Sequence, residues 1–138
     1  MKFEYLEHTA DVKFRAYGKT LDEAFGNAAL ALTPLLTEDS VERVTKREIS
    51  VSASNKEALL YDFLEELVVL QDTDGFLVAG VDSVEIKDRE KGFSLQAVVW
   101  FDHAKRYETH GDLKSVTYHE MVIEESADGC MVQVVIDV

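Results

Sequence analysis

The stretch that decides the fold is NKEALLYDFLEELVVLQDTDG, residues 55–75, which predicts one amphipathic helix. Its apolar side chains recur at helical spacing and share one face: Leu60, Phe63, Leu64, Leu67 and Val68. Acidic side chains occupy the opposite face: Asp62, Glu65 and Glu66. Asn55 is a preferred N-cap residue because its side chain can accept a hydrogen bond from a free backbone N–H. We therefore expect a helix that begins after Asn55, ends near Gly75 and buries one face.

The sequence after this helix predicts two pairs of antiparallel strands. Residues 76–86 and 93–101 are rich in β-branched and aromatic residues, and a charged loop ending in Gly92 joins them. Residues 116–124 and 131–138 form a second pair around Asp128-Gly129. That dipeptide tolerates the positive φ angles of a type I′ turn, so we expect such a turn there.

The sequence before the helix predicts three further strands and one more helix. Residues 3–6 and 12–17 have short apolar or alternating patterns. Thr20-Leu21-Asp22-Glu23 has the form of a capping box, and the helix that it starts should end or kink near Pro34, which cannot donate a backbone hydrogen bond. Residues 41–53 read as an edge or half-solvated strand, since charged residues interrupt them.

This order of elements does not alternate strand and helix as a parallel, doubly wound sheet would. We therefore predict an α+β fold with a mostly antiparallel sheet and two helices. The 138 residues suit one domain, spanning 1–138.

Composition narrows the classes of function. The formal net charge of −13 disfavours direct binding of nucleic acid through a basic face. No apolar run approaches the roughly 20 residues that cross a bilayer, so no membrane association is expected. Cys130 is the only cysteine, and the first residues lack the apolar core of a signal peptide, so we expect a cytoplasmic protein in a reducing compartment.

Standard catalytic motifs are missing from the sequence. No glycine pattern matches a phosphate-binding loop, and no nucleophile elbow surrounds Ser115, although His119 is near it in sequence. The four histidines lack the spacing of common zinc motifs, so each is expected to be a surface or structural residue. Two-residue periodicity places His119 on the same face as Met121 and Ile123, which predicts that it packs at the rim of the core, and places Asp137 beside Tyr118 or Glu120 on the other face. A ligand pair of His119 with Asp137 would require a bulge.

Two acidic residues near strand ends are the best candidates for chemistry. Asp11 directly precedes a strand, where its side chain can cap a turn or bind a cation, and residue type alone favours the cap. Asp137 is followed by Val138, whose α-carboxylate adds a second negative charge. Such groups repel each other unless a positive group lies between them. A hard cation is one solution, and a Lys or Arg side chain is the other.

Several segments, taken together, resemble the archease family along the whole chain. They are His8-Thr9-Ala10-Asp11-Val12, Gly18-Lys19-Thr20-Leu21-Asp22-Glu23-Ala24-Phe25, Leu113-Lys114-Ser115-Val116-Thr117-Tyr118-His119 and Val135-Ile136-Asp137-Val138. The resemblance implies a single-domain archease-like α+β fold and an accessory protein of the RtcB-type RNA-splicing ligase, which promotes guanylylation and multiple turnover of that ligase in tRNA splicing and broadens its nucleotide use. It implies no catalytic residues in this chain.

The resemblance also implies a site. Asp11, Asp137 and Val138 match the family's ligands for a divalent cation, often calcium, and Lys114 matches a lysine implicated in activation. Two other classes of function remain open at this point: a small metal-dependent phosphohydrolase, and a general chaperone or interaction module.

Overall fold

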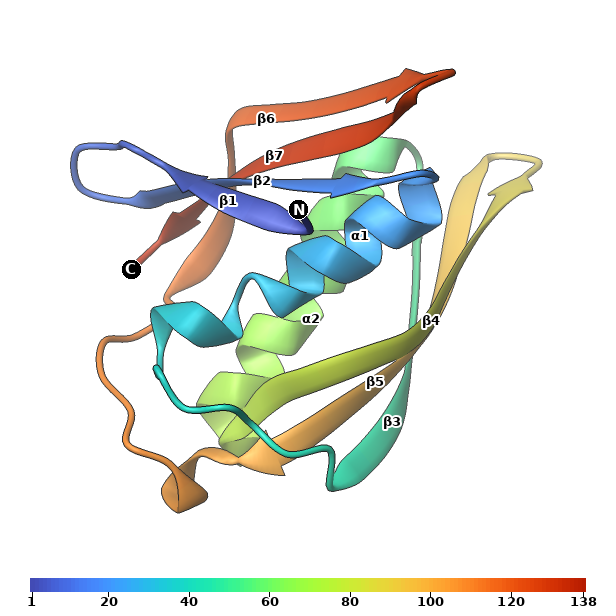
Figure 1. The fold of residues 1–138 in the computed structure, drawn as a ribbon. Coiled ribbons are helices and arrows are strands. Elements are labelled where there is room, and N and C mark those ends of the chain that lie inside the picture. Colours follow the sequence, from blue (N-terminus) through green and yellow to red (C-terminus); the bar gives the residue numbers. More distant parts are fainter.

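Two helices lie between two antiparallel sheets in the computed structural model, which describes residues 1–138 (Figure 1). The helices are α1 (Leu21–Leu30) and α2 (Lys56–Asp74). One sheet has the order β1 (Phe3–Leu6), β2 (Val12–Gly18), β7 (Gly129–Asp137), β6 (Ser115–Ser126). The other has the order β3 (Thr45–Ala53), β5 (Gly92–His103), β4 (Phe76–Arg89). Short 3₁₀ turns are η1 (Thr33–Leu35) and η2 (Ala104–Arg106). The expected α+β fold with two helices and antiparallel strands is confirmed.

Helix α2 forms as its sequence predicts. The Asn55 side chain accepts a hydrogen bond from the Ala58 backbone N–H at 2.8 Å. Gly75 ends the helix with φ of 70°, a left-handed conformation that glycine adopts without steric cost. The buried face combines the expected apolar stripe with Leu59. Neither helix is long and apolar enough to cross a membrane.

The core lies where the helices meet both sheets. Helix α1 contacts β2 and β4, whereas α2 contacts β6 and β3. Phe25 of α1 and Phe63 of α2 stack with ring centroids 6.5 Å apart, and both are fully buried. All buried apolar residues except Val135 form one cluster of 28, so the helices and both sheets share a single core. The four-stranded sheet thus has an inner face against the helices and an outer face turned away from them (Figure 1).

Two sequence-based details of the strands are wrong. Strand β3 begins at Thr45 rather than at residue 41, and it pairs only with β5, so it is the expected edge strand in shortened form. In the β6–β7 hairpin, Ser126 pairs with Gly129, which makes Ala127 and Asp128 the central residues of the turn. A type I′ turn needs positive φ at both central residues, and neither has it, so the turn is of another type.

Strand β6 also contains a large, irregular bulge. Thr117 pairs with Val135, and the next pair is Val122 with Gln133, so residues 118–121 all lie opposite Val134. Glu120, within the bulge, has φ of 52° and is the only non-glycine residue with positive φ. The bulge breaks the two-residue alternation of β6 and redirects the side chains within it.

A buried carboxylate anchors the segment that follows β5. Asp102 is 3% exposed and accepts hydrogen bonds from the Tyr107 hydroxyl at 2.5 Å, the Arg106 guanidinium at 3.0 Å and the His103 backbone N–H at 2.8 Å. The Tyr107 hydroxyl is the largest cause that lowers the pKa of Asp102 below its ordinary value.

We predict that Asp102→Asn destabilises the protein at neutral pH and that its effect shrinks in acid. Because the folded-state pKa is lowered, the carboxylate stabilises the fold above the unfolded pKa of about 3.9, and this contribution disappears as pH falls through the folded-state pKa. Urea unfolding of both proteins at several pH values between neutral and strongly acidic measures the difference in unfolding free energy. A difference that stays constant across this range would contradict a contribution from the carboxylate charge.

Candidate functional site

One end of the four-stranded sheet gathers the acidic residues that the sequence singles out. Val12 of β2 pairs with Ile136 of β7, so Asp11 directly precedes this pair on one strand and Asp137 directly follows it on the neighbouring, antiparallel strand. Both side chains are partly exposed, and Val138 is 37% exposed. Strands β2 and β7 therefore bring these residues to neighbouring positions at one sheet end.

Lys114 is attached to the same end. Its backbone N–H donates a hydrogen bond to the Asp137 carbonyl oxygen at 2.8 Å, and its side chain is exposed. Asp137 pairs with Ser115, and not with a position beside Tyr118 or Glu120 as two-residue periodicity predicts. The cause is the bulge in β6, which shifts the register between the two strands.

No cationic side chain of this chain neutralises the acidic pair. Neither Asp11 nor Asp137 forms an ion pair with a Lys, Arg or His. Asp11 also accepts no backbone hydrogen bond, so the turn cap that its residue type favours is not formed. Two explanations were open for such an acidic pair: a Lys or Arg side chain between the carboxylates, or a bound cation. The structure has no Lys or Arg side chain in that position. The donor set is all oxygen, which fits a hard cation such as calcium.

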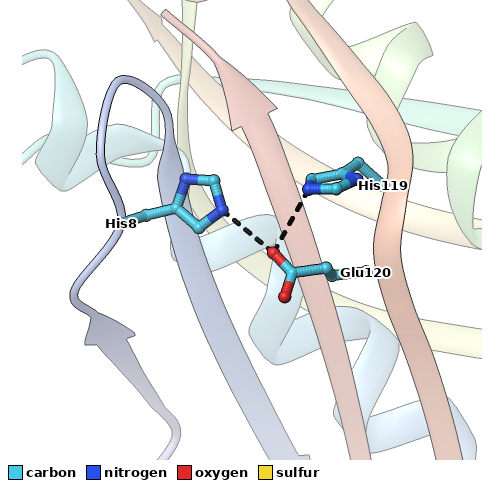
Figure 2. Close-up of side chains that lie close together, drawn as sticks. All are labelled: His8, His119 and Glu120. Atoms are coloured by element: carbon cyan, nitrogen blue, oxygen red, sulfur yellow. Dashed lines mark hydrogen bonds and ion pairs between the residues drawn. The ribbon is translucent and has the colours of Figure 1, made fainter.

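A second cluster lies on β6 and on the loop between β1 and β2. Figure 2 shows His8, from that loop, and His119, from β6, both pointing toward the Glu120 carboxylate. Nε2 of His8 is 2.9 Å from Oε2 of Glu120, and Nε2 of His119 is 3.4 Å from the same oxygen. The candidate ligand atoms of the three residues all lie within 4.8 Å of one another.

The bulge in β6 explains this cluster and corrects the prediction for His119. The His119 side chain is 66% exposed and does not pack at the rim of the core, whereas Met121 and Ile123 do contact the core. The Gln133 side-chain amide donates to the Glu120 carbonyl oxygen at 2.8 Å and holds the bulge in place. Arg15 in turn donates to the Gln133 side-chain oxygen at 2.9 Å.

A hydrogen bond and a neighbouring positive charge favour the ionised form of Glu120. Its pKa is lowered, first by the hydrogen bond with His8 and then by Lys13, whose Nζ is 3.7 Å from Oε1. The His8 side chain is only 14% exposed, and its buried Nδ1 has no hydrogen-bond partner. The mostly buried imidazole therefore makes its polar contact through Nε2 alone.

This cluster is not predictable from the sequence, because its residues are far apart along the chain. His8 and Glu120 are separated by 112 residues, and no short motif spans such a distance. The only local signal is the adjacent pair His119-Glu120, which in a regular strand would point to opposite faces.

Comparisons with known proteins agree over the whole chain. The model of the archease protein family (MTH1598/TM1083) matches residues 3–138. Protein archease of Methanosarcina acetivorans is 39% identical over 142 residues, covering 99% of this chain and 96% of the relative. Protein archease of Thermococcus kodakarensis is 43% identical over 131 residues, covering 93% and 92%.

Solved structures have the same fold. The solution structure of Methanobacterium thermoautotrophicum protein 1598 superposes with a TM-score of 0.83 at 31% identity, covering 99% of each chain. A Thermotoga maritima archease, described as a possible chaperone, superposes with a TM-score of 0.58 at 20% identity, covering 96% of this chain and 94% of that one, which supports the fold alone.

Fold and comparisons together define a small α+β protein with two helices and two antiparallel sheets. The chain belongs to the archease family.

Proposed function

We propose that this protein activates an RNA-splicing ligase of the RtcB type, promoting the ligase's guanylylation and multiple turnover and broadening its nucleotide use. Family membership supports this role. The observation that carries the proposal is the acidic end of the four-stranded sheet. Asp11 and Asp137 lie next to the paired residues of β2 and β7 there, and neither has a cationic partner. The backbone N–H of Lys114 donates a hydrogen bond to the Asp137 carbonyl oxygen. The ligase is the proposed partner, and the proposed setting is the cytoplasm.

In this proposal Asp11, Asp137 and Val138 hold a divalent cation. Their oxygen donors favour calcium or magnesium over zinc, and the family resemblance favours calcium. A bound cation would supply a positive charge at this sheet end, and oxygen atoms of a partner could also coordinate it. The residues of this chain neutralise and orient that charge, while the exposed Lys114 side chain remains free to contact the ligase. The strongly acidic surface, with a net charge of −13, would favour association with a basic RNA-handling enzyme.

This role requires no active site in the accessory protein. The main surface hollows are lined by residues other than Asp11, Lys114 and Asp137, so this sheet end offers groups on an open surface instead of a substrate pocket. Such groups can complete a partner's active site. Preorganised charge stabilises the charge that develops in a transition state, whichever of the two proteins supplies it.

An independent metal-dependent phosphohydrolase is the second candidate, favoured by the His8, His119 and Glu120 cluster. Histidine and carboxylate ligands are typical of hydrolytic metal centres. The exposure of His119 argues against it, and so does the position of the cluster outside the main surface hollows. A general interaction module, the third class, would need neither cluster.

One experiment separates the three functions. A purified cognate ligase is assayed for guanylylation and RNA joining with sub-stoichiometric amounts of this protein, with calcium or with a chelator, and the isolated protein is assayed for phosphate-ester hydrolysis with calcium or zinc. Catalytic, calcium-dependent stimulation of the ligase supports our proposal. Hydrolysis without stimulation would favour the phosphohydrolase, and stimulation that needs stoichiometric protein and no metal would favour the interaction module.

We predict that Lys114→Ala lowers activation of the ligase at least about tenfold, the equivalent of one charge-assisted contact of about 1.4 kcal/mol. Its thermal unfolding should match that of the unmodified protein, because the side chain is exposed and only its backbone N–H contacts Asp137. Lys91→Ala, at the exposed β4–β5 turn, is the matched control. Full activation by the Lys114→Ala protein would remove this lysine from the site.

A further inference from the structure

We propose that His8, His119 and Glu120 bind a zinc ion at a site separate from the oxygen-donor site formed by Asp11, Asp137 and Val138. Imidazole nitrogen with one carboxylate oxygen is a donor set that favours zinc and similar first-row metals over calcium or magnesium. This inference goes beyond ligase activation, since it concerns other residues and another class of metal.

The distances from Glu120 Oε2 to the two imidazole nitrogens are close to those of a tetrahedral site. Zinc bonds of about 2.0–2.2 Å in tetrahedral geometry place neighbouring ligand atoms about 3.3–3.6 Å apart. The distance of 3.4 Å between His119 Nε2 and Glu120 Oε2 already matches this value. The 2.9 Å between His8 Nε2 and the same oxygen is a hydrogen-bond distance, so His8 must retreat by roughly half an ångström to admit the metal.

The backbone around Glu120 is held in the required conformation. A glutamate with φ of 52° adopts a left-handed backbone conformation, which carries an energetic cost for a residue with a Cβ atom. Gln133 is only 6% exposed, and the hydrogen bond that its side chain donates to the Glu120 carbonyl oxygen offsets part of this cost. Without the bulge, His119 and Glu120 would point to opposite faces, so the strained conformation is what brings both ligands together.

The hydrogen bond between His8 and Glu120 does not by itself explain the position of His119. The His119 side chain is 66% exposed and is therefore free to extend into solvent, yet its Nε2 points to the same carboxylate oxygen as His8 (Figure 2). The two imidazole rings are 6.0 Å apart in an edge-to-face arrangement. The candidate ligand atoms of all three residues lie within 4.8 Å of one another, which is close enough for one metal ion to be shared among them.

The second carboxylate oxygen of Glu120 has its own partner. Lys13 Nζ lies 3.7 Å from Oε1, so a metal on Oε2 leaves this ion pair in place. Such outer contacts orient a ligating carboxylate. Three protein ligands leave a fourth position on an exposed face, which a water molecule or a ligand from a docked protein can occupy.

The test is titration of the full-length protein with zinc chloride by calorimetry and with cobalt chloride by visible absorption. We expect one equivalent of zinc to bind and cobalt to give the intense bands of a tetrahedral complex. Loss of an outer contact to a metal ligand typically weakens affinity 10–100-fold, so loss of a ligand should cost at least about 100-fold. His8→Ala, His119→Ala and Glu120→Gln should all show this loss.

Two controls keep the test specific. His110→Ala removes an exposed histidine outside the cluster, and Asp11→Asn removes a ligand of the proposed calcium site; both should bind zinc as the unmodified protein does. Because His119 is mostly exposed, His119→Ala should remain folded by circular dichroism. The proposal is overturned if the unmodified protein binds no zinc stoichiometrically, if folded His119→Ala binds zinc as tightly, or if Asp11→Asn loses zinc to the same extent as His119→Ala.

Discussion

Replacing Asp11 with alanine is expected to abolish activation of an RtcB-type ligase without destabilising the fold. Asp11 is partly exposed and has no ion-pair partner, so its side chain contributes little to folding. Its removal also relieves repulsion with Asp137 on the neighbouring strand. In the absence of metal, the melting temperature of the variant should therefore equal or exceed that of the unmodified protein.

Calcium makes the same prediction measurable without the ligase. A ligand that binds only the folded state at 100 times its dissociation constant stabilises it by about 2.7 kcal/mol. The unmodified protein should melt at a higher temperature with calcium, and Asp11→Ala should show no such increase. A residue appended after Val138 should also weaken the effect, because the free carboxylate is displaced. Asp72→Ala, on exposed surface of α2, is the control and should behave as the unmodified protein.

Phe63→Ala should produce the largest loss of stability, about 3–5 kcal/mol in unfolding free energy. Phe63 is fully buried and stacks on Phe25 where the two helices meet, so the substitution removes apolar contacts and leaves a cavity between both sheets. Chemical denaturation measures the effect. Val69→Ala, on the same helix but 46% exposed, should change stability by less than about 1 kcal/mol. Equal effects of the two substitutions would contradict the position of the core.

Sequence alone predicts the elements that local patterns determine. The Asn55 cap, the apolar stripe of α2 and the glycine at its end each depend on neighbouring residues, and all are confirmed. The turn at Asp128-Gly129 is not, because pairing of Ser126 with Gly129 moves the turn centre one residue earlier. A dipeptide that tolerates a turn type does not fix which residues lie at its centre.

The two candidate sites differ in how much of each can be predicted from the sequence. The proximity of Asp11 and Asp137 requires only that the first long strand and the last one be neighbours, and the structure has this pairing. The cluster of His8, His119 and Glu120 depends on a bulge held by Gln133. Regular alternation along β6 would place His119 toward the core. The residue pattern of β6 does not reveal the bulge, so the cluster is not predicted from it.

Ligase guanylylation at sub-stoichiometric amounts of this protein tests the central proposal most directly. The amount of guanylylated ligase and of joined RNA is measured with the unmodified protein, with Asp11→Ala and with neither. We predict that the unmodified protein drives many turnovers for each molecule present, and that Asp11→Ala gives the level seen without added protein. Equal stimulation by both proteins would contradict the proposed role of the acidic sheet end, and no stimulation by the unmodified protein would contradict ligase activation itself.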